Sequence, residues 1–135
     1  MFLITSANGK TGHALMAVLR RRGLEFRAMT QSATSSAQLS ERGAADVVVG
    51  DLRNRDDVVR ACDCVEAAYF ITPNFSPDEA AMADNLIGVC SDKGARVVLH
   101  SVIHPQIQVL PHHWSRLLVE EKVIEVLKTC YDPEI

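Results

Sequence analysis

Small polar residues and two glycines are concentrated in one segment near the N-terminus, directly after the first apolar run. Residues 4–12 read Ile-Thr-Ser-Ala-Asn-Gly-Lys-Thr-Gly. In a turn from a strand into a helix, such residues let backbone N–H groups and the helix N-terminus meet a pyrophosphate. Gly9 permits close approach of the backbone, and Gly12 permits close packing of the helix on the strand. The turn predicts a dinucleotide site, with phosphate-binding residues Ser6, Asn8, Gly9, Lys10, Thr11 and Gly12.

Ser6 stands where a dinucleotide-binding turn usually has its first glycine. It can still serve if its φ angle is negative, and its hydroxyl can then donate to a phosphate. The alternative is a strand-to-helix turn whose glycines serve geometry alone. A P-loop is excluded, because that motif needs a glycine five residues before Gly9, where this chain has Ile4.

The residues that would meet the adenosine ribose follow the second apolar run, roughly 20 residues beyond the glycines. Gln31 stands there between a threonine and a serine, so neither a carboxylate for NAD nor an arginine for NADP is present. Since nothing acidic would repel a 2′-phosphate, and Lys10 can reach one, the sequence favours NADP(H) over NAD(H). Asp51 and Leu52, after the third apolar run, are predicted to meet the adenine, although Asp51 can equally cap a turn.

Histidines form the second group of residues that could do chemistry. Four of the five lie between residues 100 and 113. Neutral imidazoles there can transfer a proton or bind a metal, but no cysteine or carboxylate is spaced to complete a zinc site, so we expect no metal. As catalytic candidates we take His112 and His113 as acid or base, with Ser101 and His104 orienting a carbonyl. The alternative for His112 and His113 is a helix start whose rings stack or cap.

These residues are positioned by apolar runs that alternate with helical patterns. The expected strands span residues 2–5, 24–29, 46–50, 65–71 and 95–100. The expected helices span residues 11–22, 32–42, 54–62, a segment from the N-cap Ser76 to near Gly94, and 111–128. Continuously apolar strands separated by helices require a parallel sheet covered on both faces. We therefore predict a doubly wound, Rossmann-like α/β fold of about five strands in three α/β/α layers, with residues 1–135 as one domain.

Charge and hydropathy exclude several other classes of protein. The 135 residues include 14 Lys and Arg against 17 Asp and Glu, for a net charge of −3, and no basic stripe could hold nucleic acid. The longest apolar run, residues 65–71, is interrupted by Glu66 and is too short to span a membrane. No secretory signal begins the chain, so we expect a cytoplasmic protein with reduced cysteines.

Taken together, the motifs resemble the NmrA-like family of atypical short-chain dehydrogenase/reductases. The resemblance runs from residue 1 to about residue 128 and rests on the segments 5–12, 71–74, 101–105, 111–116 and 119–121. It implies a Rossmann fold that binds NAD(P)(H), with Thr72, Pro73 and Arg116 added to the cofactor-binding residues. The family includes both NADPH-dependent reductases and nucleotide-sensing regulators without catalysis.

Classical relatives use a serine with a Tyr-x-x-x-Lys pair, in which tyrosine donates a proton and lysine lowers the pKa of that tyrosine. The tyrosine position falls at His112, which fits the NmrA-like pattern, and the lysine position falls at Arg116, which departs from it. Arginine is a poor replacement for a titratable amine, although Arg116 can still hydrogen-bond a ribose. Neither Tyr69 nor Tyr131 obviously supplies the missing acid.

Family members continue beyond the last expected helix into a further strand and a smaller region that closes over the substrate. The resemblance therefore implies that this chain corresponds to the cofactor half and lacks the C-terminal substrate region. The strand at 95–100 then lies at the sheet edge. That edge predicts a homodimer or another protein partner that completes the site. The broad apolar face of the last helix supports the same prediction, and it comprises Leu117, Leu118, Val119, Val123, Ile124 and Leu127.

Three functions follow from these observations. The first is a nucleotide-sensing or regulatory protein, or a catalytically reduced relative of the short-chain reductases. The second is a small enzyme, either an NADPH-dependent reductase or a non-redox isomerase or cyclase with His112 or His113 as acid or base. The third is an interaction domain with a vestigial cleft and no nucleotide affinity.

Overall fold

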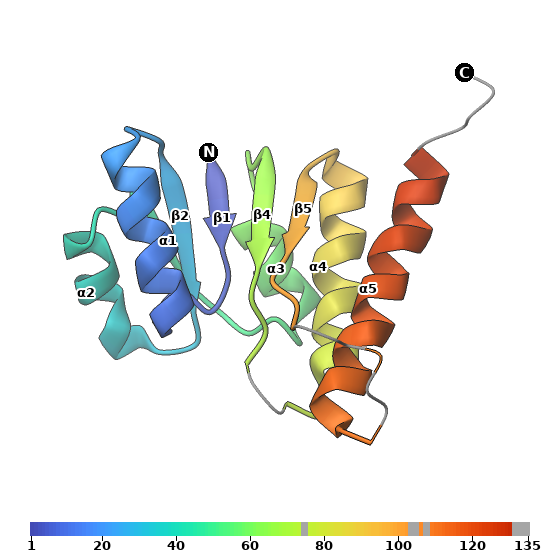
Figure 1. Ribbon diagram of the computed structural model, residues 1–135. Helices are drawn as coiled ribbons and strands as arrows, with labels where there is room; N and C mark the ends of the chain where they lie inside the picture. Colours follow the sequence, from blue (N-terminus) through green and yellow to red (C-terminus); the bar gives the residue numbers. More distant parts are fainter. Residues whose placement is uncertain (74–75, 103–105, 107–108, 131–135) are drawn as a thin grey trace.

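The computed structural model of the protein describes residues 1–73, 76–102, 106 and 109–130, with side chains as far as residue 126. Its five strands form one parallel sheet in the order β3-β2-β1-β4-β5 (Figure 1). The strands are β1 (Phe2–Ile4), β2 (Phe26–Thr30), β3 (Asp46–Val49), β4 (Ala67–Phe70) and β5 (Arg96–Leu99). Phe2 of β1 is in register with Phe26 of β2 and Ala67 of β4, so the carboxyl ends of these strands meet at one edge. The predicted Rossmann-like α/β fold is confirmed.

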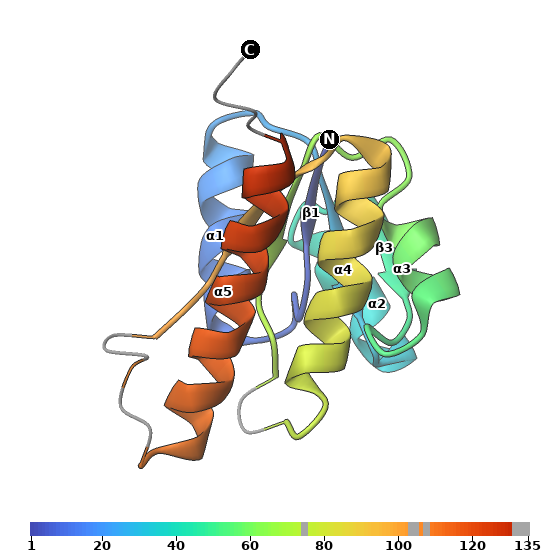
Figure 2. The ribbon, with the colours of Figure 1, turned by 90° about the vertical axis from the view of Figure 1, so that its right-hand side faces the viewer.

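Helices cover both faces of this sheet (Figures 1 and 2). They are α1 (Lys10–Arg21), the 3₁₀ turn η1 (Ala33–Ser35), α2 (Ser36–Glu41), α3 (Arg55–Ala61), α4 (Glu79–Lys93) and α5 (Pro111–Cys130). α1 and α2 pack on one face, whereas α3 and α4 pack on the other, with α5 beside α4. Among the described residues, none of the helices is long and apolar enough to cross a membrane.

The two faces of the sheet belong to two hydrophobic clusters. On β1, Leu3 faces α3 and α4, while Ile4 faces α1 and α2, and both side chains are fully buried. This alternation is the period of two expected for a strand covered on both sides. α1 packs closely because Gly12 has no side chain: a Cβ there would lie 2.5 Å from the carbonyl oxygen of Ala7.

Two expected helix boundaries are wrong. Residues 32–42 do not form one helix, since η1 comes first and only six residues of α2 follow. The Ser32 N–H donates to the Thr30 hydroxyl at 3.1 Å, a local side chain–backbone bond that favours a turn before η1. α4 begins at Glu79 with Asp78 as its N-cap, rather than from Ser76. The Ser76 hydroxyl instead accepts a hydrogen bond of 3.3 Å from the Asp78 N–H.

Beside α1, the sheet surface over β4 and β5 forms an apolar groove of about 260 Å³, which we call the β5 groove. Its lining residues are Phe2, Leu3, Ile4, Leu15, Leu19, Ala67, Ala68, Tyr69, Arg96 and Val98. Val98 is 49% exposed, although it lies in a strand. The groove shows that α1 covers this face of the sheet only in part.

The broad apolar face expected for α5 is divided in the structure. Val119 is fully buried and Val123 packs on the same cluster, which α4 also joins. Leu118 and Ile124 are exposed instead. One side of α5 therefore completes the core, while apolar residues on another side face solvent.

Candidate functional site

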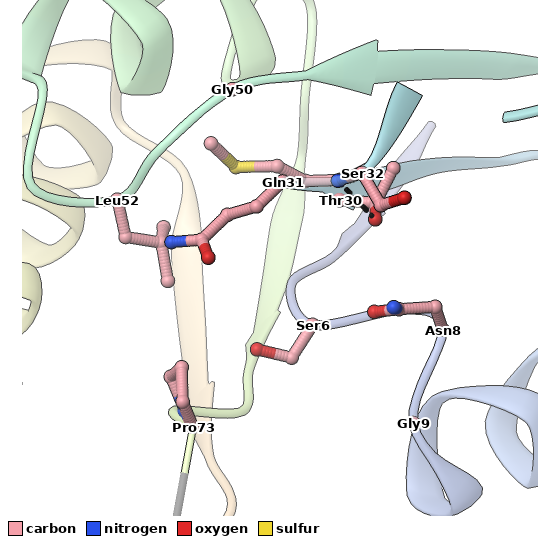
Figure 3. Close-up of a pocket in the computed structure, with 10 residues that line it drawn as sticks. Ser6, Asn8, Gly9, Thr30, Gln31, Ser32, Gly50, Leu52 and Pro73 are labelled. Carbon is pink, nitrogen blue, oxygen red and sulfur yellow. Dashed lines mark hydrogen bonds between the residues drawn. The ribbon is translucent and has the colours of Figure 1, made fainter. Parts of the chain in front are cut away.

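A pocket of about 470 Å³ opens at the carboxyl ends of the strands (Figure 3). The segments that follow β1, β2, β3 and β4 all contribute to it, and its lining residues are Ser6, Asn8, Gly9, Met29, Thr30, Gln31, Ser32, Gly50, Leu52 and Pro73. β1 lies between β2 and β4. Strands β2 and β3 are added on one side of β1, and strands β4 and β5 on the other, so the strand order reverses at this point. Open α/β sheets bind ligands at such a topological switch point.

The turn from β1 into α1 forms one wall of the pocket. Gly9 is the N-cap of α1, with φ −81° and ψ 169°, and no side chain caps the helix. The first turn of α1 also contains no acidic residue. Backbone N–H groups and the positive end of the helix dipole are therefore available to an anion beside Asn8 and Gly9.

Ser6 does not have the negative φ that its role in this turn required. Its φ is +47°, in the left-handed region that glycine usually occupies. The Ser6 hydroxyl donates to the carbonyl oxygen of Ile71 at 2.9 Å. The neighbouring Thr5 hydroxyl donates to the same oxygen at 2.7 Å and accepts from the Ile71 N–H at 2.8 Å. These bonds fix the turn against the end of β4 and occupy the Ser6 hydroxyl.

The opposite wall comes from the segments after β2 and β3. Gln31 extends toward Leu52, and Gly50 lies above them in the view of Figure 3. The Ser32 N–H donates to the Thr30 hydroxyl at 3.1 Å, which holds the chain in a turn at the end of β2. In the described part of the chain, the residues that line the pocket include no carboxylate and no basic side chain.

Asp51 lies beside the pocket but is not among its lining residues. Its carboxylate accepts a hydrogen bond of 2.9 Å from the Arg53 N–H and forms an ion pair of 2.5 Å with the Arg53 guanidinium. The hydrogen bonds from the Arg53 side chain are the main cause that holds the pKa of Asp51 below its usual value, and the Gln31 side chain adds a smaller effect. Asp51 thus forms the turn that the sequence offered as its alternative role.

Arg116 is buried away from the pocket. Its Nε lies 2.7 Å from Oε1 of Glu79, and burial lowers the pKa of Arg116 while Glu79 opposes that shift. Its Nη1 donates to the His100 carbonyl at 3.0 Å and its Nη2 lies 3.5 Å from the Thr72 carbonyl oxygen. Thr72 is also buried, and its hydroxyl donates to the same Glu79 oxygen at 2.9 Å. Arg116, Glu79 and Thr72 do not line the pocket, whereas Pro73, which follows Thr72, does.

Of the residues expected to be catalytic, Ser101, His112 and His113 do not line the pocket. Ser101 donates its hydroxyl to Glu120 of α5. The rings of His112 and His113, at the start of α5, lie 6.2 Å apart at 90° in an edge-to-face arrangement. His104 lies outside the described residues.

The structure therefore brings together half of the expected cofactor-binding residues. Ser6, Asn8, Gly9, Gln31, Leu52 and Pro73 line the pocket, whereas Lys10, Thr11, Gly12, Asp51, Thr72 and Arg116 do not. Four lining residues were not among the candidates, namely Met29, Thr30, Ser32 and Gly50. Three of these four adjoin a candidate in the sequence, so a wider window after each strand would have included them. Met29 has no comparable signal, because a buried methionine in a strand is typical of the core.

The parallel sheet, the switch point and the uncapped helix beside it define a dinucleotide-binding Rossmann domain. A model of the NAD(P)H-binding family matches residues 6–126, and the chain belongs to this family. None of the curated proteins compared with the chain matches it.

Solved structures of similar fold include two cofactor complexes. An NADPH-dependent quinone oxidoreductase of Escherichia coli, complexed with NADPH, has a TM-score of 0.83 at 19% identity, over 93% of this chain and 45% of that one. A triphenylmethane reductase of Citrobacter sp., complexed with NADP(H), has a TM-score of 0.78 at 16% identity, over 93% of this chain and 46% of that one. A Bacillus halodurans protein described as an NAD-dependent epimerase/dehydratase has a TM-score of 0.74 at 26% identity. The match covers 94% of this chain and 64% of that one. This chain spans about half the length of the two reductases.

Proposed function

We propose that this NAD(P)H-binding domain takes NADP(H) in the pocket and acts as an NmrA-like nucleotide-sensing protein or a catalytically reduced relative of the reductases. The buried ion pair between Arg116 and Glu79 carries this proposal. Arg116 stands where the classical reductases have a lysine that lowers the pKa of the proton donor. An arginine that is 1% exposed and paired with Glu79 does not supply a titratable amine to the pocket.

The pocket suits the pyrophosphate of a dinucleotide at the α1 end. Asn8 and Gly9 line it there, and the extended backbone of Gly9 leaves room for close approach. A Cβ at Gly9 would lie 3.4 Å from the Ser6 carbonyl oxygen, which is an ordinary contact. A larger side chain at Gly9 can therefore occupy the ligand's space without disrupting the turn.

The adenosine end of the pocket supports NADP(H). Thr30, Gln31 and Ser32 present neutral polar groups after β2, which do not repel a 2′-phosphate. The nearby Asp51 carboxylate is paired with Arg53. The two reductases of similar fold were solved with NADPH or NADP(H), which is consistent with the same preference.

Calorimetric titration with NADPH, NADP⁺ and NAD⁺ tests the binding proposal. We expect the wild-type protein to bind NADPH and NADP⁺ more tightly than NAD⁺, and Gly9→Val to weaken binding by at least about tenfold. Circular dichroism should show an unchanged fold for Gly9→Val. Binding that is absent in the wild-type protein, or unaffected by Gly9→Val, would refute the assignment of this pocket.

The second candidate is an NADPH-dependent reductase, which the two reductases of similar fold favour. NADPH supplies a hydride to a substrate when it is bound, and this chain would have to supply the proton. His112, in the first turn of α5, is the residue we would then place as the proton donor. Steady oxidation of NADPH with a quinone, lost in His112→Ala while NADPH still binds, would establish this reductase and reject the sensor.

A further inference from the structure

The β5 groove lies on a kind of surface that proteins rarely leave open. Parallel sheets are normally covered by helices on both faces, because their strands are apolar on both sides. Here Val98 is 49% exposed, and Phe2, Leu15 and Leu19 form an apolar surface around it. The physical requirement is a helix with an apolar stripe that can lie over β4 and β5.

α5 carries such a stripe on the side that faces away from α4. Trp114, Leu118 and Ile124 are 38%, 37% and 51% exposed. Trp114 and Leu118 are four residues apart, and the exposed Glu121 and Glu125 follow one and two turns later. These four side chains therefore lie on one side of the helix. Ile124 lies about 80° around the helix from Trp114, so the outer stripe of α5, as we use the term, consists of Trp114, Leu118, Glu121 and Glu125. It is about 17 Å long at 1.5 Å per residue, which is close to the roughly 13 Å of a four-residue strand.

The charges of the two surfaces are complementary. Arg96 is the charged residue that lines the β5 groove, and Glu121 and Glu125 are the charged residues of the outer stripe. Within the described part of the chain, none of these three side chains forms an ion pair. A copy of the chain seated in the groove would give Arg96 a carboxylate partner.

We propose that this protein forms a two-fold symmetric dimer, in which the outer stripe of α5 in each copy covers the β5 groove of the other. Figures 1 and 2 show α5 at the β5 end of the sheet, the end where the groove lies. The two surfaces are thus neighbours around one edge of the molecule. A single two-fold axis beside β5 forms both contacts at once, which doubles the apolar area that is buried. An unrelated partner helix could fill only one groove.

Charge reversal on each surface tests this arrangement. Light scattering and sedimentation of the wild-type protein at micromolar concentration should give twice the mass of one chain. Arg96→Glu alone should be monomeric, because the introduced carboxylate then faces Glu121 and Glu125 in both contacts. The double variant Glu121→Lys/Glu125→Lys should be monomeric for the same reason, since its lysines then face Arg96.

An equimolar mixture of these two variants should form a dimer again, since both contacts of the mixed dimer then join opposite charges. Arg42→Glu, at an exposed position just after α2 and at the β3 end of the sheet, is the matched control and should remain dimeric. A monomeric wild-type protein, variants that stay dimeric on their own, or a mixture that stays monomeric would each overturn the proposal. The proposal does not depend on nucleotide binding, which calorimetry of the monomeric variants measures separately.

Discussion

Nε of Arg116 lies 2.7 Å from Oε1 of Glu79, and both side chains are almost completely buried. The pair joins two helices, because Arg116 belongs to α5 and Glu79 begins α4. Both residues also contact Thr72 at the end of β4. Removing one partner leaves a buried charge, which is more costly than removing both.

Replacement of Arg116 by methionine should therefore lower the free energy of unfolding by about 3–5 kcal/mol. The double variant Arg116→Met/Glu79→Gln should lose less than the sum of the two single variants, because the introduced amide carries no charge. Urea denaturation of the four proteins measures this coupling. Arg55→Met is the control, since Arg55 pairs with Asp92 on the surface and its loss should cost about 1 kcal/mol or less. Strictly additive effects of Arg116 and Glu79 would contradict the role of the pair.

Ser6 combines an unfavourable backbone conformation with a favourable hydrogen bond. Its φ of +47° costs a residue with a Cβ about 1–2 kcal/mol, while the bond to Ile71 contributes about 0.5–1.5 kcal/mol. Ser6→Gly loses both effects and should leave stability nearly unchanged. Ser6→Ala retains the strain without the bond and should be less stable than Ser6→Gly. Thermal unfolding of the two variants ranks them, and an alanine variant as stable as the glycine variant would be inconsistent with this account.

The two glycines of the β1–α1 turn should respond differently to alanine. A Cβ at Gly12 would lie 2.5 Å from the Ala7 carbonyl oxygen, and backbone on both sides must then shift. We expect Gly12→Ala to destabilise the fold by about 1–3 kcal/mol. Gly9→Ala should leave stability nearly unchanged, because the nearest atom is 3.4 Å away and φ is −81°. Chemical denaturation measures the free energy of unfolding of both variants. Equal losses of stability would show that close packing of α1 on β1 is not what makes Gly12 necessary.

Acid should weaken the segment that follows β3. Hydrogen bonds from Arg53 lower the pKa of Asp51, and the Asp51 N–H and Arg60 lower the pKa of Asp57, which accepts that N–H at 2.9 Å. Each carboxylate is therefore held more strongly by the folded chain than by the unfolded one. Its contribution is complete above the ordinary value near 3.8 and disappears as the pH falls through the lowered pKa.

NMR titration should place both midpoints below 3.8, and Arg53→Gln should raise the Asp51 midpoint toward that value. The Asp57 midpoint should change little in the same variant, which makes it an internal reference. A midpoint for Asp51 that does not respond to Arg53→Gln would contradict the assigned cause.

The arrangement of the sheet could be predicted from the sequence because apolar runs and helical patterns alternate along the whole chain. The pocket walls followed from the same pattern, since the carboxyl ends of parallel strands share one edge. The place of Arg116 could not be predicted, because its partner Glu79 lies far away in the sequence and belongs to another helix. The positive φ of Ser6 could not be predicted either, because it is held by a hydrogen bond to Ile71, which follows β4 and is distant in the sequence. The break within residues 32–42 had a local signal, a run of serines and threonines whose hydroxyls compete with the helix.

The shared carbonyl oxygen of Ile71 has a consequence for the energetics of ligand capture. The hydroxyls of Thr5 and Ser6 both bind it, so the segments after β1 and β4 are tied together in the free protein. A ligand at Asn8 and Gly9 meets a wall that is already ordered. Less conformational entropy is then lost on association, and the affinity reflects the contacts made rather than the cost of shaping the site. Such preorganisation predicts binding without a slow isomerisation phase.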